Sequence, residues 1–459
     1  MFDLLIKNGN VVTPAGTRRM QVAVLDGKIH ALEAELTGPA RKTIDAAGKL
    51  VFPGFIDAHT HMGIPIMNTF SVDDFESGSV AAACGGVTTI VDFTVQEPGQ
   101  SLHESVATRL EKAGGKCHVD YALHVNVTDQ AEARLPEIPQ LIEDGFRAFK
   151  VFSTYRQAGM MVTWAQFRQV LQTVDAHGGL LCLHAEDNDL VEQETARHIS
   201  SGDLAAIFHP RSRTAEAEAR AIARAAEIAR ELDAALYIVH LSSRAGLEAA
   251  LEARARGSKL FLETCPQYLV LTEECYLRKD GHLWITTPPL RREEDVEALW
   301  QALADGSIDV VATDHCPFTV AQKDAGGGVF HQTPNGLPGV ETLFPLLYTF
   351  GVAQGRISLS RLVQVLAGNP ARIFGLSPHK GGISKGLDAD LVIWDPEQTV
   401  EIKAEQLHGK ADWSPYSGLT VSGRVDYTIL RGQVLVEEGR FRGESVVGQL
   451  LRAQKGEQR

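Results

Sequence analysis

Eight short apolar runs between residues 54 and 315 constrain the fold of this chain more than any other feature. Each run has the composition of a strand and is followed by a polar loop or by a helical stretch such as TAEAEARAIARAAEIARELD. The runs are GFIDAHTH, TTIVDF, DYALHVNV, FRAFKVF, LLCLHAE, ALYIVHLS, KLFLETCP and DVVATDH. Strands that alternate with helices form parallel sheets, and eight such units close into a barrel. We therefore predict an α/β fold with a TIM-type (β/α)8 barrel over residues 53–377.

The two chain ends share a different pattern. Residues 1–52 contain short alternating runs broken by turn signals, such as QVAVLDGKIHAL, which predict a small antiparallel β unit. The same pattern returns near the other end in GRVDYTILRGQVLVEEGRF. We predict that residues 1–52 and 378–459 together form a small, sandwich-like β domain, and that the polar end RAQKGEQR is disordered.

Charge and cysteine content limit the classes of partner. Acidic residues outnumber basic ones by 58 to 44, and the formal charge of −14 disfavours nucleic acid and anionic membranes as partners. The six cysteines include no CxxC pair, which is typical of a reduced protein. The stretch MFDLLIKNGNVV does not resemble a signal peptide, and no segment reaches the ~18 apolar residues of a membrane span. We expect a cytoplasmic protein that acts on a small molecule, with no membrane partner.

Metal-ligand residues collect at the ends of the predicted strands, where the active site of such a barrel lies. The first run ends with His59 and His61, which are two apart and therefore share one face. Later runs contribute Lys150, His184, His240 and Asp314. A single histidine at a strand end is more often a packing residue than a ligand, but four of them favour a metal site. His124 and His315 are not needed to complete this set.

Four imidazoles and one carboxylate exceed the three protein ligands of one catalytic zinc site. Two metal sites need an oxygen donor that bridges ions ~3.5–4 Å apart. Lys150 is a candidate bridge, because it shares a strand face with Phe146, Ala148 and Phe152, where an ammonium is costly to bury. A lysine that has reacted with CO2 carries a carbamate, which can serve as a bridging carboxylate. The sequence leaves open the alternative of a lysine whose ammonium reaches solvent at the barrel mouth.

Eight motifs, in order along the chain, carry a resemblance to a known family. They are GFIDAHTHM, FKVFSTY, HAED, YIVHLSS, ETCPQYL, PPLR, ATDHCPF and PNGLPG, and KGLDADLVIWDP extends the match over nearly the whole chain. With these motifs the chain resembles the dihydropyrimidinase and hydantoinase branch of the amidohydrolase superfamily.

The resemblance implies six metal ligands: His59, His61, Lys150, His184, His240 and Asp314. The two histidines of the first strand and the aspartate would bind one divalent ion, and the two later histidines would bind a second. A CO2-derived carbamate on the lysine would bridge them. Zinc is the first candidate for both ions, although these donors also suit Mn²⁺, Ni²⁺ or Co²⁺.

The resemblance further implies hydrolysis of a cyclic amide, in which a dihydropyrimidine or 5-substituted hydantoin ring opens to an N-carbamoyl amino acid. Asp314 would act as general base, and Tyr155 would donate a hydrogen bond to the developing oxyanion. Thr287 and Asn335 would fix the ring amides through their main chain. Thr287 replaces the family's usual serine, a change of little consequence for a main-chain contact. A homotetramer is expected from the resemblance alone.

Three alternatives are weaker. A dihydroorotase would be expected to carry an arginine after the HxH motif, and allantoinases commonly continue with EPG, whereas this chain continues with MGIPIM. Some relatives have lost ligands and serve as structural assembly proteins, but all the expected ligand positions are filled here. The apolar loop favours a substrate with a hydrophobic substituent or none. The candidate wall residues are Met62, Ile64, Phe93, Phe152 and Met160.

Overall fold

Eight parallel strands form the central sheet of the computed structural model, which describes residues 1–128 and 130–454. Their order is β6-β9-β10-β11-β12-β13-β14-β15, and a parallel bridge between Thr60 and His315 brings the first and last strands together. The strands are β6 (Phe55–Thr60), β9 (Val87–Phe93), β10 (Asp120–Asn126), β11 (Ala148–Phe152), β12 (Leu180–His184), β13 (Ala235–Ile238), β14 (Lys259–Thr264) and β15 (Val310–Val311). All eight predicted strands and the barrel are thereby confirmed.

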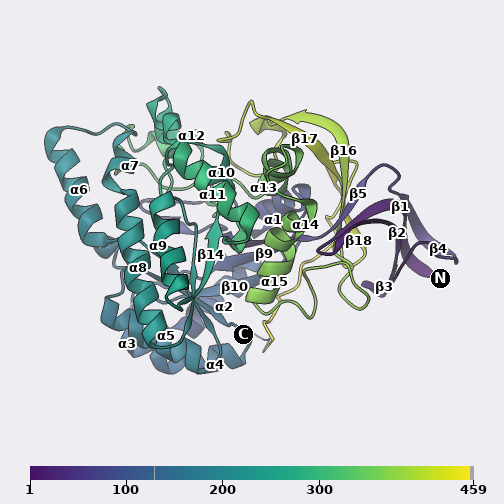
Figure 1. The fold of residues 1–459 in the computed structure, drawn as a ribbon, viewed down its shortest axis with the longest axis horizontal. Coiled ribbons are helices and arrows are strands. Elements are labelled where there is room, and N and C mark those ends of the chain that lie inside the picture. Colours follow the sequence, from purple (N-terminus) through teal and green to yellow (C-terminus); the bar gives the residue numbers. More distant parts are fainter. Residues whose placement is uncertain (129, 455–459) are drawn as a thin grey trace.

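Helices surround the barrel (Figure 1). The α-helices are α1 (Phe75–Cys84), α2 (Leu102–Ala113), α3 (Ala131–Arg134), α4 (Ile138–Glu143), α5 (Trp164–Ala176), α6 (Asn188–Ser201), α7 (Phe208–Ser212), α8 (Ala215–Glu231), α9 (Arg244–Ala255), α10 (Pro266–Val270), α11 (Glu293–Asp305), α12 (Val320–Asp324), α13 (Leu343–Leu346), α14 (Leu359–Val363) and α15 (Asn369–Ile373). The longest, α8, begins after Thr214, whose side chain accepts a hydrogen bond from the Ala217 amide. Its buried face repeats alanine every four residues from Ala217 to Ala229, so small side chains face the core.

Shorter helical turns lie in the connecting loops or continue α-helices directly. The 3₁₀ turns are η1 (Leu135–Glu137), η2 (Arg156–Ala158), η3 (Glu273–Leu277), η4 (Gly281–Trp284) and η7 (Ala404–Gln406), and the π-helical turns are η5 (Leu347–Ala353) and η6 (Gln364–Gly368). A small hairpin of β7 (Pro65–Ile66) and β8 (Thr69–Phe70) follows the first barrel strand. In the part of the chain that the structure describes, no helix has both the length and the apolar character to cross a membrane.

Both chain ends contribute to a second, nine-stranded sheet beside the barrel (Figure 1). Its strands are β1 (Phe2–Thr13), β2 (Gly16–Leu25), β3 (Lys28–Glu33), β4 (Ala40–Asp45), β5 (Leu50–Pro53), β16 (Leu391–Glu401), β17 (Thr420–Leu430), β18 (Gln433–Glu437) and β19 (Arg440–Phe441). The N-terminal unit is not wholly antiparallel as predicted, because β4 and β5 both pair with β1 in parallel. The β5–β16 pairing joins the two chain ends. The domain limits 1–52 with 378–459 and 53–377 stay a prediction.

Lys380 connects this sheet to the N-terminal end of the barrel strands. Its buried ammonium lies 2.6 Å from carboxylate oxygens of Asp120 and Asp390, and 3.0 Å from Asp388. Asp120 opens β10, whereas the other two residues precede β16. The charge of the lysine is therefore compensated by carboxylates from both parts of the fold.

The end of the described chain packs beneath the barrel. The Ala453 amide donates to the Gly145 carbonyl at 3.0 Å, and the Gln454 amide donates to the Gly375 carbonyl at 3.1 Å. The prediction that the segment from residue 452 onward is disordered is therefore wrong for residues 452–454, whose backbone partners come from distant loops. The remainder of that segment, 455–459, lies outside the described residues.

Candidate active site

Five of the six predicted ligands lie at or just beyond the C-terminal ends of four barrel strands, and Lys150 lies in the middle of a fifth strand, β11. Three of them converge closely: Asp314 Oδ1 is 2.9 Å from His61 Nε2 and 3.1 Å from His59 Nε2. The ligand atoms of this trio all lie within 4.8 Å of one another. The other two imidazoles, of His184 and His240, have ring centroids 4.5 Å apart, and the His240 ring stacks 5.5 Å from that of His59. The side chains thus form two adjacent groups.

Three of the predicted site residues have a left-handed backbone. The φ angles are 67° at Tyr155, 39° at His240 and 55° at Asp314. Such conformations cost non-glycine residues about 1–3 kcal/mol each and are concentrated at functional sites. At each of these positions the chain has just left a strand, so the turn redirects the side chain.

Lys150 is buried rather than extended to solvent. Its side chain lies in the middle of β11 and is 1% exposed, with Nζ 4.8 Å from the centroid of the Phe93 ring and 5.2 Å from that of Phe152. No carboxylate of the described residues lies within 4 Å of this nitrogen. Burial lowers the pKa of Lys150, which favours the neutral amine that can attack CO2. The alternative of a lysine that reaches bulk water is therefore wrong.

Three of the four predicted imidazole ligands have the protonation state that metal binding requires. Burial lowers the pKa of His61, His184 and His240, so these rings are neutral and have a free electron pair. At His59 burial acts in the same direction, but Glu263 and Asp314 outweigh it and raise the pKa to about 9. His59 therefore occupies a place where the surroundings favour positive charge.

Several imidazole nitrogens at the C-terminal mouth of the barrel, which could bind a metal, are buried without a hydrogen-bond partner. Among the described residues they include His61 Nδ1 and His240 Nδ1. Buried polar atoms are rarely left unpaired unless a ligand or ion takes them up. The donor set of imidazole nitrogens and one carboxylate matches the preference of zinc and similar divalent ions. The residues present therefore fit a metal centre.

Glu263 at the end of β14 is a site residue that the sequence analysis missed. One of its oxygens lies 2.7 Å from His59 Nδ1 and accepts a hydrogen bond of 3.0 Å from the His240 amide, and the other accepts from the Tyr237 hydroxyl at 2.8 Å. A carboxylate that holds the second nitrogen of a ligating histidine fixes the orientation of the ring. One sequence signal could have identified Glu263. Like Lys150, it is a charged residue inside an apolar run, here KLFLETC.

A second carboxylate, Glu186, holds His184, one of the later pair of histidines. It lies 2.6 Å from His184 Nε2, which leaves Nδ1 of that ring for a metal, and it also pairs with Arg213. The Arg213 guanidinium stacks 4.9 Å from the Tyr155 ring. Burial raises the pKa of Tyr155 to about 12 although Arg213 opposes it, so the phenol keeps its proton. Asp187, the last residue of the HAED motif, instead caps α6 by accepting from the Leu190 amide.

The predicted substrate contacts lie beside these groups. Tyr155 and Asn335 line a cavity of about 360 Å³ that Arg213 also borders. Thr287 is buried, and its hydroxyl has no hydrogen-bond partner within the described part of the chain. Of the candidate wall residues, Met62 packs instead into the core, where its sulfur occupies the space next to Gly78 of α1. The roles of the other four stay a prediction.

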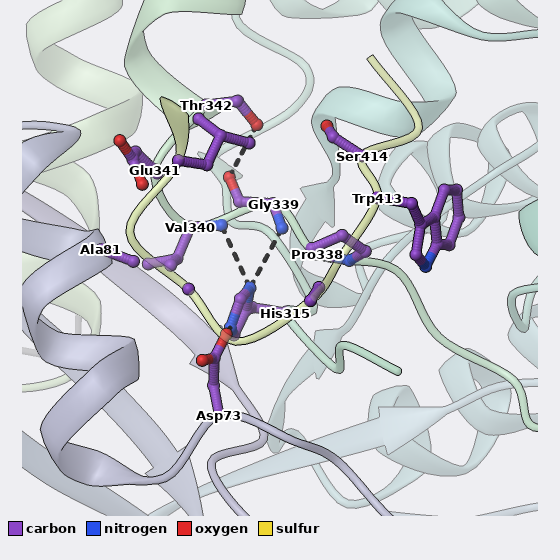
Figure 2. Close-up of a pocket in the computed structure, with 13 residues that line it drawn as sticks. Asp73, Ala81, His315, Pro338, Gly339, Val340, Glu341, Thr342, Trp413 and Ser414 are labelled. Carbon is purple, nitrogen blue, oxygen red and sulfur yellow. Dashed lines mark hydrogen bonds and ion pairs between the residues drawn. The ribbon is translucent and has the colours of Figure 1, made fainter. Parts of the chain in front are cut away.

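His315, next to Asp314, has a structural role. Its Nδ1 accepts from the amides of Gly339 and Val340 at 3.0 and 3.3 Å, and its Nε2 donates to Asp73 at 3.1 Å (Figure 2). These side chains border a cavity of about 20 Å³, enough for roughly one water. His315 thereby anchors the loop that follows Asn335 to the end of β15. His124 is likewise structural, since its Nε2 lies 3.0 Å from the Ala58 carbonyl.

Comparison with known proteins places this geometry in a family. The model of the amidohydrolase family matches residues 50–435. The chain is 41% identical to a D-hydantoinase of Ralstonia pickettii over the whole of both chains, and 40% identical to a D-phenylhydantoinase of Escherichia coli O1:K1 over 98% of each. The crystal structure of a dihydropyrimidinase from Brevibacillus agri NCHU1002 superimposes with a TM-score of 0.97 at 35% identity, covering 99% of both chains. This chain belongs to the amidohydrolase family, in its dihydropyrimidinase and hydantoinase branch.

Proposed function

We propose that this enzyme hydrolyses the cyclic amide bond of dihydropyrimidines or 5-substituted hydantoins and releases N-carbamoyl amino acids. The observation that carries the proposal is the cluster of His59, His61 and Asp314, with the rings of His184 and His240 beside it, in a chain similar over its full length to a D-hydantoinase. A non-catalytic assembly protein would not need to keep that set. The proposal therefore names a hydrolase and not a structural homologue.

We propose that two divalent ions, zinc first among the candidates, bind at this mouth. His59, His61 and Asp314 would hold one ion, and His184 and His240 would hold the other. The carbamate of Lys150 would bridge them, and the lowered pKa and burial of that amine support its modification. When bound, such a pair lowers the pKa of a water and stabilises negative charge on the carbonyl oxygen.

The side chains of the chain itself would direct the proton and the ring. Asp314 is held in its charged form, because His59 and His61 lower its pKa well below the usual value although burial opposes them. It can take a proton from water and return it to the leaving ring nitrogen. Tyr155 keeps its proton and can donate a hydrogen bond to the oxyanion. Thr287 and Asn335 would orient the ring amides through their main chain.

A substrate panel tests this proposal. We expect turnover of dihydrouracil, hydantoin or 5-phenylhydantoin, and at least about 100-fold lower kcat/KM on dihydroorotate, because the MGIPIM loop offers no cation for its carboxylate and an unpaired buried charge costs several kcal/mol. The measurement is initial rate against substrate concentration for each ring, with allantoin included. Preference for dihydroorotate or allantoin would overturn the assignment.

We also propose a homotetramer, for which the family resemblance is the support. Sedimentation at micromolar concentration is expected to give a single species of about four times the 49.9 kDa chain mass. Gel filtration coupled to light scattering provides a second measure of that mass. A protein that sediments only as a monomer contradicts the proposal.

A reducing, cytoplasmic location is proposed from the cysteines. All six are free thiols in the structure, and four of them, Cys117, Cys182, Cys265 and Cys316, are buried. Burial raises the pKa of each of these four thiols, so they behave as small core side chains rather than as nucleophiles or redox partners.

A further inference from the structure

Lys323 in α12 is a buried lysine that the reaction does not use. Its side chain is 0% exposed, and its Nζ donates hydrogen bonds of 2.7 Å to the carbonyls of Ile285 and Pro334. Within the described part of the chain no carboxylate lies within 4 Å of it, unlike Lys380 with its three aspartates. Burial of an ammonium without a carboxylate is costly, so this lysine requires an explanation.

The two carbonyls belong to the segments that carry the proposed ring contacts. Ile285 is two residues before Thr287, and Pro334 immediately precedes Asn335. The segments also touch directly, because the Gly336 amide donates to the Ile285 carbonyl at 3.1 Å. Lys323 thus joins two backbone stretches that are distant in sequence and that must both be in place to bind one ring.

The rest of α12 is anchored in the same region. Gln322 donates to the Thr69 hydroxyl at 2.6 Å and to the Phe70 carbonyl at 2.9 Å, both in β8. Asp324 lies 2.6 Å from His282 Nε2, three residues before Ile285. A helix of five residues is marginal alone, so these anchors fix its position and with it the position of the lysine.

We propose that Lys323 is a positioning residue that sets the distance between the main chain at Thr287 and at Asn335, and thereby the affinity for the cyclic amide substrate. This inference rests on the proposed function. Burial lowers the pKa of Lys323 to about 7, and the neutral amine retains two hydrogens for the two carbonyls. These two hydrogen bonds, which we call the Lys323 clamp, therefore do not depend on the charge of the lysine.

The Lys323→Met variant tests the clamp, because methionine fills a similar volume and donates no hydrogen bond. We expect KM for hydantoin or dihydrouracil to rise about tenfold or more, as follows from two lost hydrogen bonds of ~1 kcal/mol each, with kcat changed less than about threefold. Bound metal is expected to equal that of the unmodified enzyme. Hydrogen–deuterium exchange of peptides covering 285–290 and 334–340 is expected to accelerate.

Arg361→Met is the matched control. Arg361 donates to the carbonyls of Leu303 and Ile308 before β15, at the opposite end of the barrel. Its replacement also removes a partly buried cation from two carbonyls, so it is expected to lower the Tm but to leave KM and exchange in the two peptides unchanged.

The outcomes separate the clamp from the proposed function. A KM within twofold of the unmodified enzyme, or exchange no faster than in Arg361→Met, overturns the inference. If Lys323→Met does not fold, Lys323→Gln is the second variant. Its NH2 group lies one bond nearer the backbone than the lysine nitrogen and is withdrawn from the two carbonyls, so an unchanged KM in that variant overturns the inference equally. If the unmodified enzyme opens none of the rings, the proposed function fails. Exchange in the two peptides then still decides whether Lys323 holds the loops together.

Discussion

We expect the Lys150→Ala variant to lose most of its bound metal and to lose activity by at least about 10³-fold, since a bridged metal pair contributes several kcal/mol to transition-state stabilisation. The remaining imidazoles and Asp314 fall into two groups, and only a donor between them can hold two ions beside a shared water. Lys150 lies in β11, beside the strand that carries His184, and its buried nitrogen has no carboxylate within 4 Å among the described residues.

Two further variants sharpen this prediction. Lys150→Arg is expected to fail as well, because a guanidinium stays protonated and cannot accept CO2. Short carboxylic acids added to Lys150→Ala are expected to restore part of the activity by occupying the vacated bridge. The decisive measurement is metal stoichiometry at neutral pH with bicarbonate present. Two equivalents retained by Lys150→Ala would rule out the bridge.

The strand ends were predictable from the sequence for a physical reason. In a parallel barrel the carboxyl ends of all strands meet at one mouth, so the last residues of each apolar run identify the site without knowledge of any distance. His59, Lys150 and Asp314 were found in this way. The sequence of an apolar run does not show which residues each of its side chains contacts in the folded barrel. The burial of Lys150 between Phe93 and Phe152 depends on β9, two strands away in the barrel, so the sequence left two alternatives open.

Residues that act through distant partners were not predictable. Lys323 donates to carbonyls 38 and 11 positions away, and a backbone carbonyl has no sequence signature. Glu263 connects ligands of the first and sixth barrel strands, a contact that exists only after the barrel closes. The parallel pairing of β4 and β5 with β1 was missed for a related reason. Alternation of apolar residues indicates a half-buried strand whichever direction its neighbour runs.

The Asp314→Asn variant is expected to reduce kcat by on the order of 10³-fold, within the range that a general acid or base contributes. Asparagine has nearly the same shape, but its neutral amide cannot take a proton from water and is a weaker metal ligand than a carboxylate. The Asp314 oxygen lies within 3.1 Å of both first-strand imidazoles, so the substitution also removes the negative charge that they share. The measurements are kcat on the best substrate of the panel and bound metal at neutral pH.

Asp309→Asn is the matched control for this experiment, because it places the same substitution at the other end of the same strand. Asp309 pairs with Arg254 and accepts from the Leu262 amide at 2.9 Å, so its replacement is expected to lower the Tm while kcat stays within about threefold. In Asp314→Asn, metal retained with lost turnover identifies a base, whereas metal lost together with turnover identifies a ligand. Turnover within tenfold of the unmodified enzyme would exclude both roles, because neither survives the loss of the carboxylate charge.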